Sequence, residues 1–126
     1  MVETIIKTER IDDIPLLMQL QSKMGIGAII SEVIDGHGSR SGMSIGALIM
    51  IWLSYIVSES DHRMSEVEVW ASGQIAMLRE LIPDDVEIKD FADDRLADIL
   101  RLLSDDEDWE RIEIRLGQRL IRVYQL

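Results

Sequence analysis

The chain has 126 residues, of which 47% are apolar, and this length and composition suit one domain with a packed core. Its 24 acidic residues outnumber the 13 basic ones, and the formal charge of −11 excludes a general nucleic-acid coat protein. Cysteine is absent, which excludes disulfides, thiolate metal sites and a cysteine nucleophile. Residues 1–10 mix charges of both signs without a signal-peptide pattern, so we expect a cytoplasmic protein.

Apolar residues recur at helical spacing along most of the chain, beginning near the N-terminus. Asp12 and Asp13, followed by Pro15, predict a helix start. The apolar residues that follow at intervals of four are Leu16, Leu20 and Met24. Gly25 predicts the end of this helix, and a short apolar stretch over 26–34 leads into a glycine-rich loop at 36–42.

The most apolar segment follows this loop, and Ser44 is its predicted helix cap. Residues 41–58 form an uncharged run of 18 residues, at the lower limit for a membrane-spanning helix. Its apolar centre over 45–57 is too short for a bilayer core of ~30 Å. We therefore expect no membrane association and a buried central helix over about 44–58, with Trp52 and Leu53 in the core.

Three further helices are predicted in the second half of the chain. Ser65 to Glu68 and Ser104 to Glu107 have the spacing of capping boxes, and Asp93 and Asp94 mark a start between them. The apolar positions expected to be buried in these helices are Val67, Trp70, Ala71, Ile75, Leu78, Ile82, Leu96, Ile99, Leu100, Leu103, Trp109, Ile112, Leu116, Leu120 and Val123. These patterns predict an all-α fold, a single domain over 1–126 built as a compact bundle of about five or six helices.

Acidic residues are concentrated between Arg79 and Asp108, a segment with 12 of the 24 acids and four basic residues. Carboxylates can bind Mg²⁺, but these are neighbours at helix starts, where the helix dipole alone favours them. The two histidines, His37 and His62, have no second ligand at metal-binding spacing. We therefore predict no metal site, no cofactor and no catalytic residue.

The loop over 36–42 carries Arg40 between two serines, just ahead of Ser44. Backbone N–H groups and one guanidinium could there contact a phosphate. The loop matches neither the Walker A pattern nor the glycine pattern of dinucleotide-binding folds. The sequence is therefore compatible both with a plain turn and with an anion contact through Arg40.

The last helix combines a basic face with a second apolar face. Its arginines, spaced by four, four and three residues, are Arg111, Arg115, Arg119 and Arg122. Residues 109–126 carry a charge of +2, whereas 1–78 carry −5 and 79–108 carry −8. The arginines either solvate the helix and pair with the acids, or contact phosphate or a partner. Ile114 and Ile121, on another face, are either covered by other helices or meet another domain or subunit.

Six short segments, in this order and at these separations, resemble a known domain. They read DDIPLL at 12–17, HG at 37–38 leading to GMSIG at 42–46, SESDHR at 58–63, VEVW at 67–70, DFADDRL at 90–96 and LSDD at 103–106. The chain resembles the N-terminal helical domain, a domain of unknown function, that precedes the catalytic core in one group of bacterial and archaeal insertion-sequence DDE transposases. The similarity covers almost the whole chain.

In that family the chemistry belongs to a following RNase H-like domain, whose Asp, Asp and Glu hold two Mg²⁺ ions for strand cleavage and transfer. No residue here matches this triad, so the resemblance implies a non-catalytic part of a transposase, without enzyme activity and without the catalytic domain. It implies a role in DNA transposition, by binding the element ends or by assembling the complex.

The charge distribution makes Arg40 and the four arginines of the last helix the candidate DNA contacts, and Ile114 and Ile121 the candidate partner interface. The partner would be DNA at the transposon ends, a second copy of the chain, or the missing catalytic domain. The alternative function is a dimerisation or interdomain docking module that does not contact DNA.

Overall fold

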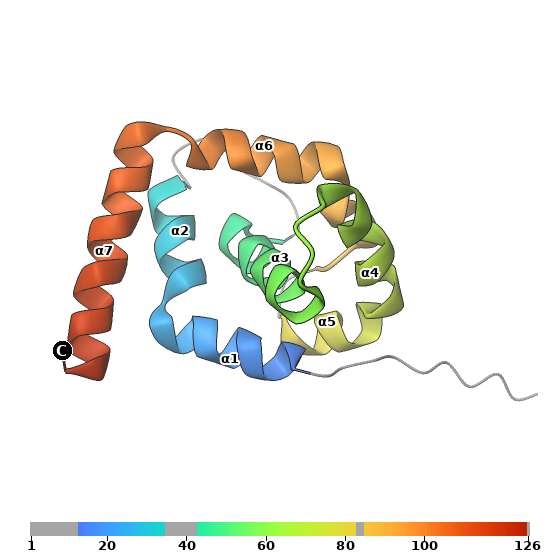
Figure 1. The fold of residues 1–126 in the computed structure, drawn as a ribbon, viewed down its shortest axis with the longest axis horizontal. Helices are drawn as coiled ribbons and strands as arrows, with labels where there is room; N and C mark the ends of the chain where they lie inside the picture. Colours follow the sequence, from blue (N-terminus) through green and yellow to red (C-terminus); the bar gives the residue numbers. More distant parts are fainter. Residues whose placement is uncertain (1–12, 35–42, 83–84, 126) are drawn as a thin grey trace, which may run out of the picture.

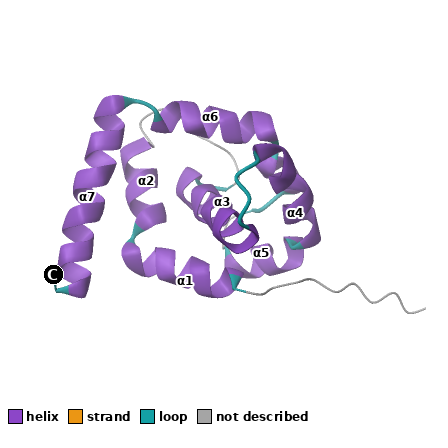
Figure 2. Cartoon of the chain, viewed as in Figure 1, coloured by secondary structure: helices purple, strands orange, loops and turns teal. Residues whose placement is uncertain are grey.

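The computed structural model describes residues 13–34, 43–82 and 85–125, in which seven α-helices and no strand are present (Figure 2). The α-helices are α1 (Ile14–Met24), α2 (Ile26–Ile34), α3 (Ile45–Glu59), α4 (Val67–Gly73), α5 (Ile75–Leu81), α6 (Asp93–Leu103) and α7 (Asp106–Tyr124). Two 3₁₀ turns, η2 (Met64–Glu66) and η3 (Ile88–Phe91), connect them. The all-α prediction is confirmed, with more helices than the expected number.

Helix α3 runs through the middle of the molecule, and the other helices surround it (Figure 1). Its start is fixed by Ser44, whose hydroxyl oxygen accepts a hydrogen bond from the Ala47 N–H at 3.2 Å. Ile51 is fully buried and Trp52 nearly so, which confirms the predicted central helix. The expectation for Leu53 is wrong, because Leu53 and Val57 lie one turn apart on the side of α3 that faces solvent, and Leu53 is 38% exposed.

Gly25 ends α1 with φ 77°, a left-handed conformation that glycine adopts without strain, and this turn sends α2 off in a new direction. The face of α1 that packs inward consists of Ile14, Met18 and Gln21, so the leucines at positions 16 and 20 are exposed. The Gln21 amide is satisfied in the core, where Nε2 donates to the Met50 carbonyl at 2.9 Å and to the Ser54 hydroxyl at 2.8 Å.

The helix predicted after Ser65 is broken in two at Gln74, which has φ −123° and ψ 13°. The first capping box is wrong, because Ser65 lies within η2 and no side chain caps α4. The second predicted capping box, at Ser104 to Glu107, is wrong by one residue. Asp105, rather than Ser104, caps α7, its carboxylate accepting from the Asp108 N–H at 2.9 Å. Ser104 instead ends α6 and donates to the Arg101 carbonyl.

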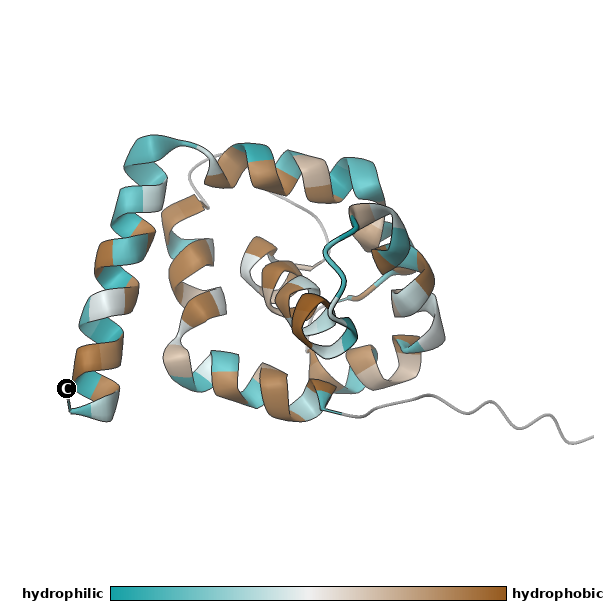
Figure 3. Cartoon of the chain, in the orientation of Figure 1, coloured by the Kyte–Doolittle hydropathy of each residue, from teal (hydrophilic) through white to brown (hydrophobic). Residues whose placement is uncertain are grey.

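Helix α2 lies between α3 on its inner side and α7 on its outer side. On the inner side, Gly27 and Gly46 let the two backbones approach so closely that a Cβ on Gly46 would lie 2.6 Å from the Gly27 carbonyl carbon. On the outer side, α7 is the peripheral element, and Figure 3 shows hydrophilic residues over much of its first half, in contrast to the apolar α3. Most side chains of α7 therefore lie at the surface of the protein.

Candidate nucleic-acid interface

Helix α7 packs on the bundle through a small part of its surface. Only Asp108 and Ile112 are buried among its residues, and Leu116, Leu120 and Val123 are half-buried. The predicted apolar stripe therefore faces the bundle for most of its length, but Trp109 at its start is exposed. This leaves the arginines at or near the surface.

The four predicted arginines have different neighbours. Arg111 pairs with Asp108 on its own helix, with 3.3 Å between Nη1 and Oδ1. Arg115 forms an ion pair with Glu32 of α2, 83 residues earlier in the chain. Arg119 lies over the turn between α1 and α2, and its Nη2 donates to the Lys23 carbonyl at 3.4 Å. Arg122 is exposed and makes no hydrogen bond or ion pair with the part of the chain that the structure describes.

A groove of about 420 Å³ separates α7 from the α1–α2 turn. The residues that line it are Ser22, Gly25, Ala28, Ile29, Glu32, Arg115, Gln118, Arg119 and Arg122. Three guanidinium groups thus face one carboxylate across the groove, which makes it a basic site on an acidic protein. Arg111 lies outside this set, and Arg40 lies outside the described residues, so the structure brings together three of the five predicted arginines.

Arg119 is the most enclosed of the three arginines in the groove. Its Nε is buried and has no hydrogen-bond partner among the described residues. The same atom lies 3.3 Å from the position that a Cβ on Gly25 would occupy, so its side chain covers the glycine turn.

Ile114 and Ile121 point away from the bundle, and they are 53% and 55% exposed. Seven residues separate them on α7, so they lie two turns apart on one face. Neither is covered by another described helix. The predicted partner-interface residues thus form an exposed apolar strip beside the groove.

The acidic residues lie where the helix dipole favours them. Asp93 and Asp94 are in the first turn of α6, and Asp106 and Glu107 are in the first turn of α7, which confirms their predicted positions at helix starts. Within the described ranges, no group of three or more carboxylate or histidine side chains is arranged to hold a metal ion. His62 is exposed in the turn after α3, and His37 lies outside those ranges.

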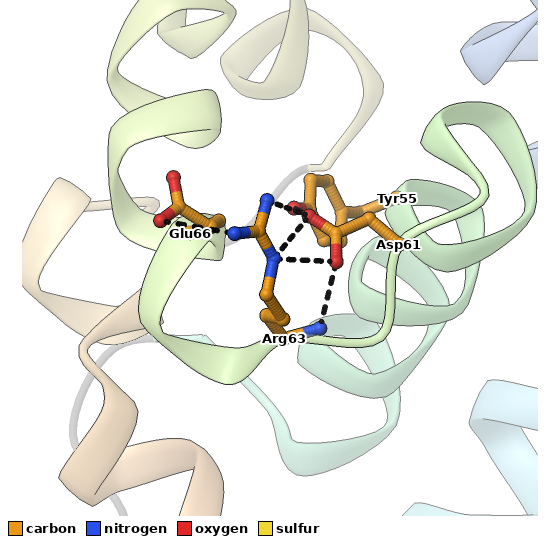
Figure 4. Close-up of polar contacts among 4 residues, drawn as sticks. All are labelled: Tyr55, Asp61, Arg63 and Glu66. Atoms are coloured by element: carbon orange, nitrogen blue, oxygen red, sulfur yellow. Dashed lines mark hydrogen bonds and ion pairs between the residues drawn. The ribbon is translucent and has the colours of Figure 1, made fainter.

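A second polar cluster, Tyr55, Asp61, Arg63 and Glu66, connects the end of α3 to η2 (Figure 4). The Tyr55 hydroxyl donates to Asp61 Oδ2 at 2.7 Å. Arg63 donates to the same carboxylate from its backbone N–H at 3.1 Å and from its guanidinium, with Nε 3.0 Å from Oδ1. The guanidinium also reaches the Glu66 carboxylate at 4.0 Å.

Each member of this cluster shifts the pKa of its neighbours. Hydrogen bonds from the Arg63 side chain, and then from Tyr55, hold the pKa of the Asp61 carboxyl well below its usual range. Burial, and then the hydrogen bond to Asp61, raise the pKa of the Tyr55 phenol well above its usual value. The same carboxylate raises the pKa of Arg63. The cluster therefore holds Tyr55 neutral and Asp61 ionised.

The Asp61 carboxylate accepts hydrogen bonds from its neighbours on both oxygens, so it connects α3 to the segment before η2. Tyr55 also packs its ring against Trp70 of α4, with 5.2 Å between ring centroids. No periodic pattern in the sequence predicts a role for these side chains. The segment SESDHR contains the signal, because an aspartate two residues before an arginine favours a turn that the carboxylate closes.

No helix within the described ranges is both long enough and apolar enough to cross a membrane. Comparisons with protein families, with curated proteins and with solved structures find no match to this chain. The features that bear on function are therefore the groove between α2 and α7 and the six segments that resemble the transposase domain.

Proposed function

We propose that this chain is the non-catalytic N-terminal domain of an insertion-sequence transposase and that it contributes to DNA transposition in the cytoplasm by contacting the DNA backbone. The observation that carries this proposal is the groove between α2 and α7, which gathers Arg115, Arg119 and Arg122 on a chain that is otherwise acidic. The six segments that resemble the transposase domain support the same function.

The spacing of these arginines fits a phosphate backbone. Arg115 and Arg122 are seven residues apart on α7, and a helix rises ~1.5 Å per residue, so the row is about 10 Å long. Along one strand of duplex DNA the charges follow each other every ~3.4 Å of helix axis, so the row can neutralise at most about three phosphates. The third of these requires Arg115 to exchange its ion pair with Glu32 for a phosphate. Such contacts position a protein on DNA without reading its sequence.

A second function is favoured by a different observation. Arg115 also holds α7 against α2 through Glu32, and Arg119 holds it against the α1–α2 turn through the Lys23 carbonyl. Ile114 and Ile121 are left exposed. This arrangement suits a dimerisation or interdomain docking module that uses the outer face of α7 without contacting DNA.

Fluorescence anisotropy of labelled duplexes at several salt concentrations tests the first function. Three phosphate contacts predict a slope of log K against log[salt] of about −3 for the element's terminal sequence and for a scrambled duplex alike. Arg122→Ala should lower the affinity for both duplexes and flatten the slope by about one, because a single phosphate contact is lost.

Arg122 suits this test because it makes no hydrogen bond or ion pair with residues 13–34, 43–82 and 85–125, so its removal breaks none of these bonds. Arg101→Ala, which removes an exposed arginine of α6 paired with Asp98, is the matched control and should leave the slope unchanged. Absence of binding to either duplex at low salt would reject the DNA proposal and leave the docking function. An equal effect of both variants would show that net charge, rather than the groove, attracts DNA.

A further inference from the structure

The corner between α6 and α7 carries an apolar groove that the proposed function does not use. It has a volume of about 410 Å³ and is lined by Leu100, Leu103, Ser104, Asp106 and Trp109. Leu100 and Trp109 are 46% and 45% exposed, although both belong to stripes that the sequence predicts to be buried. A tryptophan that remains so exposed next to leucines is typical of a protein-binding surface.

The rim of this groove is negatively charged. Asp106 lines it directly, Asp105 precedes it at the cap of α7, and Glu113 follows Trp109 by one helical turn on the same side of the helix. Asp106 and Glu113 form no ion pair with the described residues. Arg101, which follows Leu100 on α6, is already paired with Asp98 at 2.8 Å. The negative charges of Asp106 and Glu113 are therefore not neutralised by an arginine or lysine of the described residues.

We propose that the α6–α7 groove binds a positively charged polypeptide segment that inserts a large apolar side chain against Leu100, Leu103 and Trp109. Lysines or arginines on both sides of that side chain would then meet Asp106 and Glu113. The apolar contacts supply affinity, and the charge selects among partners. A second copy of this chain suits the groove poorly, because 79–108 carry −8 in each copy and repel each other.

The three tryptophans make this proposal measurable in the intact chain. Trp52 is buried and Trp70 packs against Tyr55, so only the Trp109 indole lies in the groove. The probe is a short synthetic amphipathic peptide of leucine and lysine, titrated while the three indole N–H signals are followed by NMR. We expect the Trp109 signal to shift with saturation while the Trp52 and Trp70 signals stay in place.

Charge variants test the rim. Asp106→Asn combined with Glu113→Gln should weaken binding of the lysine peptide about fivefold, the value expected for two exposed ion pairs. Glu68→Gln combined with Glu80→Gln removes the same charge on α4 and α5, and it should change the affinity by less than about twofold. The indole signals of each variant also report whether its fold is intact.

Several results would overturn the proposal. These are the absence of a Trp109 shift at excess peptide, an equal shift with a peptide that has glutamate in place of lysine, and an equal loss of affinity in both charge variants. A Trp109 shift that depends on protein concentration alone would assign the groove to a second copy of the chain. None of these results depends on DNA binding, so the test is independent of the proposed function.

Discussion

Asp61 is the central carboxylate of the polar cluster formed by Tyr55, Asp61, Arg63 and Glu66. It accepts from the Tyr55 hydroxyl on α3 and from both the backbone and the side chain of Arg63, just before η2. Tyr55 in turn contacts Trp70 of α4 through its ring. One short polar side chain thus connects the segment that follows the central helix back to that helix.

Replacing this carboxylate should make the stability of the protein less dependent on acid. Asp61 has a lowered pKa in the folded chain and a pKa of about 3.9 when unfolded, so its stabilising effect is complete above about pH 5 and is lost as the pH falls below about 4. Asp61→Asn should therefore be less stable than the parent chain near neutral pH, with a difference that shrinks in acid. Urea unfolding at several pH values measures it.

Glu59→Gln, which removes a nearby exposed carboxylate at the end of α3, is the control for this experiment. It should follow the pH dependence of the parent chain. A constant stability difference between Asp61→Asn and the parent chain from neutral to acid pH would contradict the role assigned to the Asp61 carboxylate.

At the scale of single residues, the sequence predicts side chains that share a helix and misses those that meet across the fold. The spacing of Arg115, Arg119 and Arg122 is sufficient to place them on one face. The partner of Arg115 is Glu32, and the separation of 83 residues leaves no periodic signal by which to find it. The turn that the Asp61 carboxylate closes onto the Arg63 N–H has a local signal, but the hydrogen bond from Tyr55 to that carboxylate has none.

Helix starts and ends are predicted best where a local signal is strong. Ser44 and Gly25 act as predicted, since a cap and a left-handed glycine depend on a few neighbouring atoms. The single helix expected over 67–82 fails at Gln74, because its apolar spacing continues across the break. Spacing alone also cannot show that the bundle leaves Leu100 and Trp109 uncovered.

The contact between α2 and α3 should be the least tolerant of added volume. A Cβ on Gly46 would overlap the backbone of Gly27, which no rotamer change can relieve, so Gly46→Ala should cost roughly 1–3 kcal/mol of stability or more. Gly117→Ala in the middle of α7 meets nothing within 4 Å and should add about 0.5–1 kcal/mol, because alanine favours a helix. Chemical denaturation measures both changes.

The two substitutions are expected to change the stability in opposite directions, so their comparison separates the glycine contact from the effect of alanine itself. Gly117→Ala controls for the general effect of placing alanine in a helix. Equal stabilities of the two variants would mean that α2 and α3 lie further apart than the glycine contact requires.

For the molecule as a whole, the sequence predicts the fold class and the central helix correctly, because both follow from periodic apolar residues and from one uncharged segment. The arrangement around α3 could not be predicted. Which helix lies next to which depends on contacts between distant segments, such as α2 with α7, that leave no repeat in a single sequence.

The exposed strip of Ile114 and Ile121 predicts weak self-association of the intact chain. Because each copy carries a charge of −11, salt should strengthen this association by screening the repulsion. Sedimentation velocity should show a larger average mass at high salt, and Ile114→Gln with Ile121→Gln should abolish the increase. Leu16→Gln with Leu20→Gln changes two exposed leucines of α1 and should leave it intact.

A parent chain that stays monomeric at every salt concentration would remove the case for self-association through the α7 strip. An increase in mass that the Leu16 and Leu20 changes abolish equally would show that any exposed apolar pair causes it.

The contact of Arg119 with the Lys23 carbonyl joins residues 96 positions apart and has a consequence for how the protein is made. Synthesis on the ribosome delivers α2 before α7, so α7 does not cover the outer side of α2 while the intervening chain emerges. Chaperones and proteases therefore meet this side in every nascent chain that stops short of α7. Only a chain translated through α7 can close the bundle there.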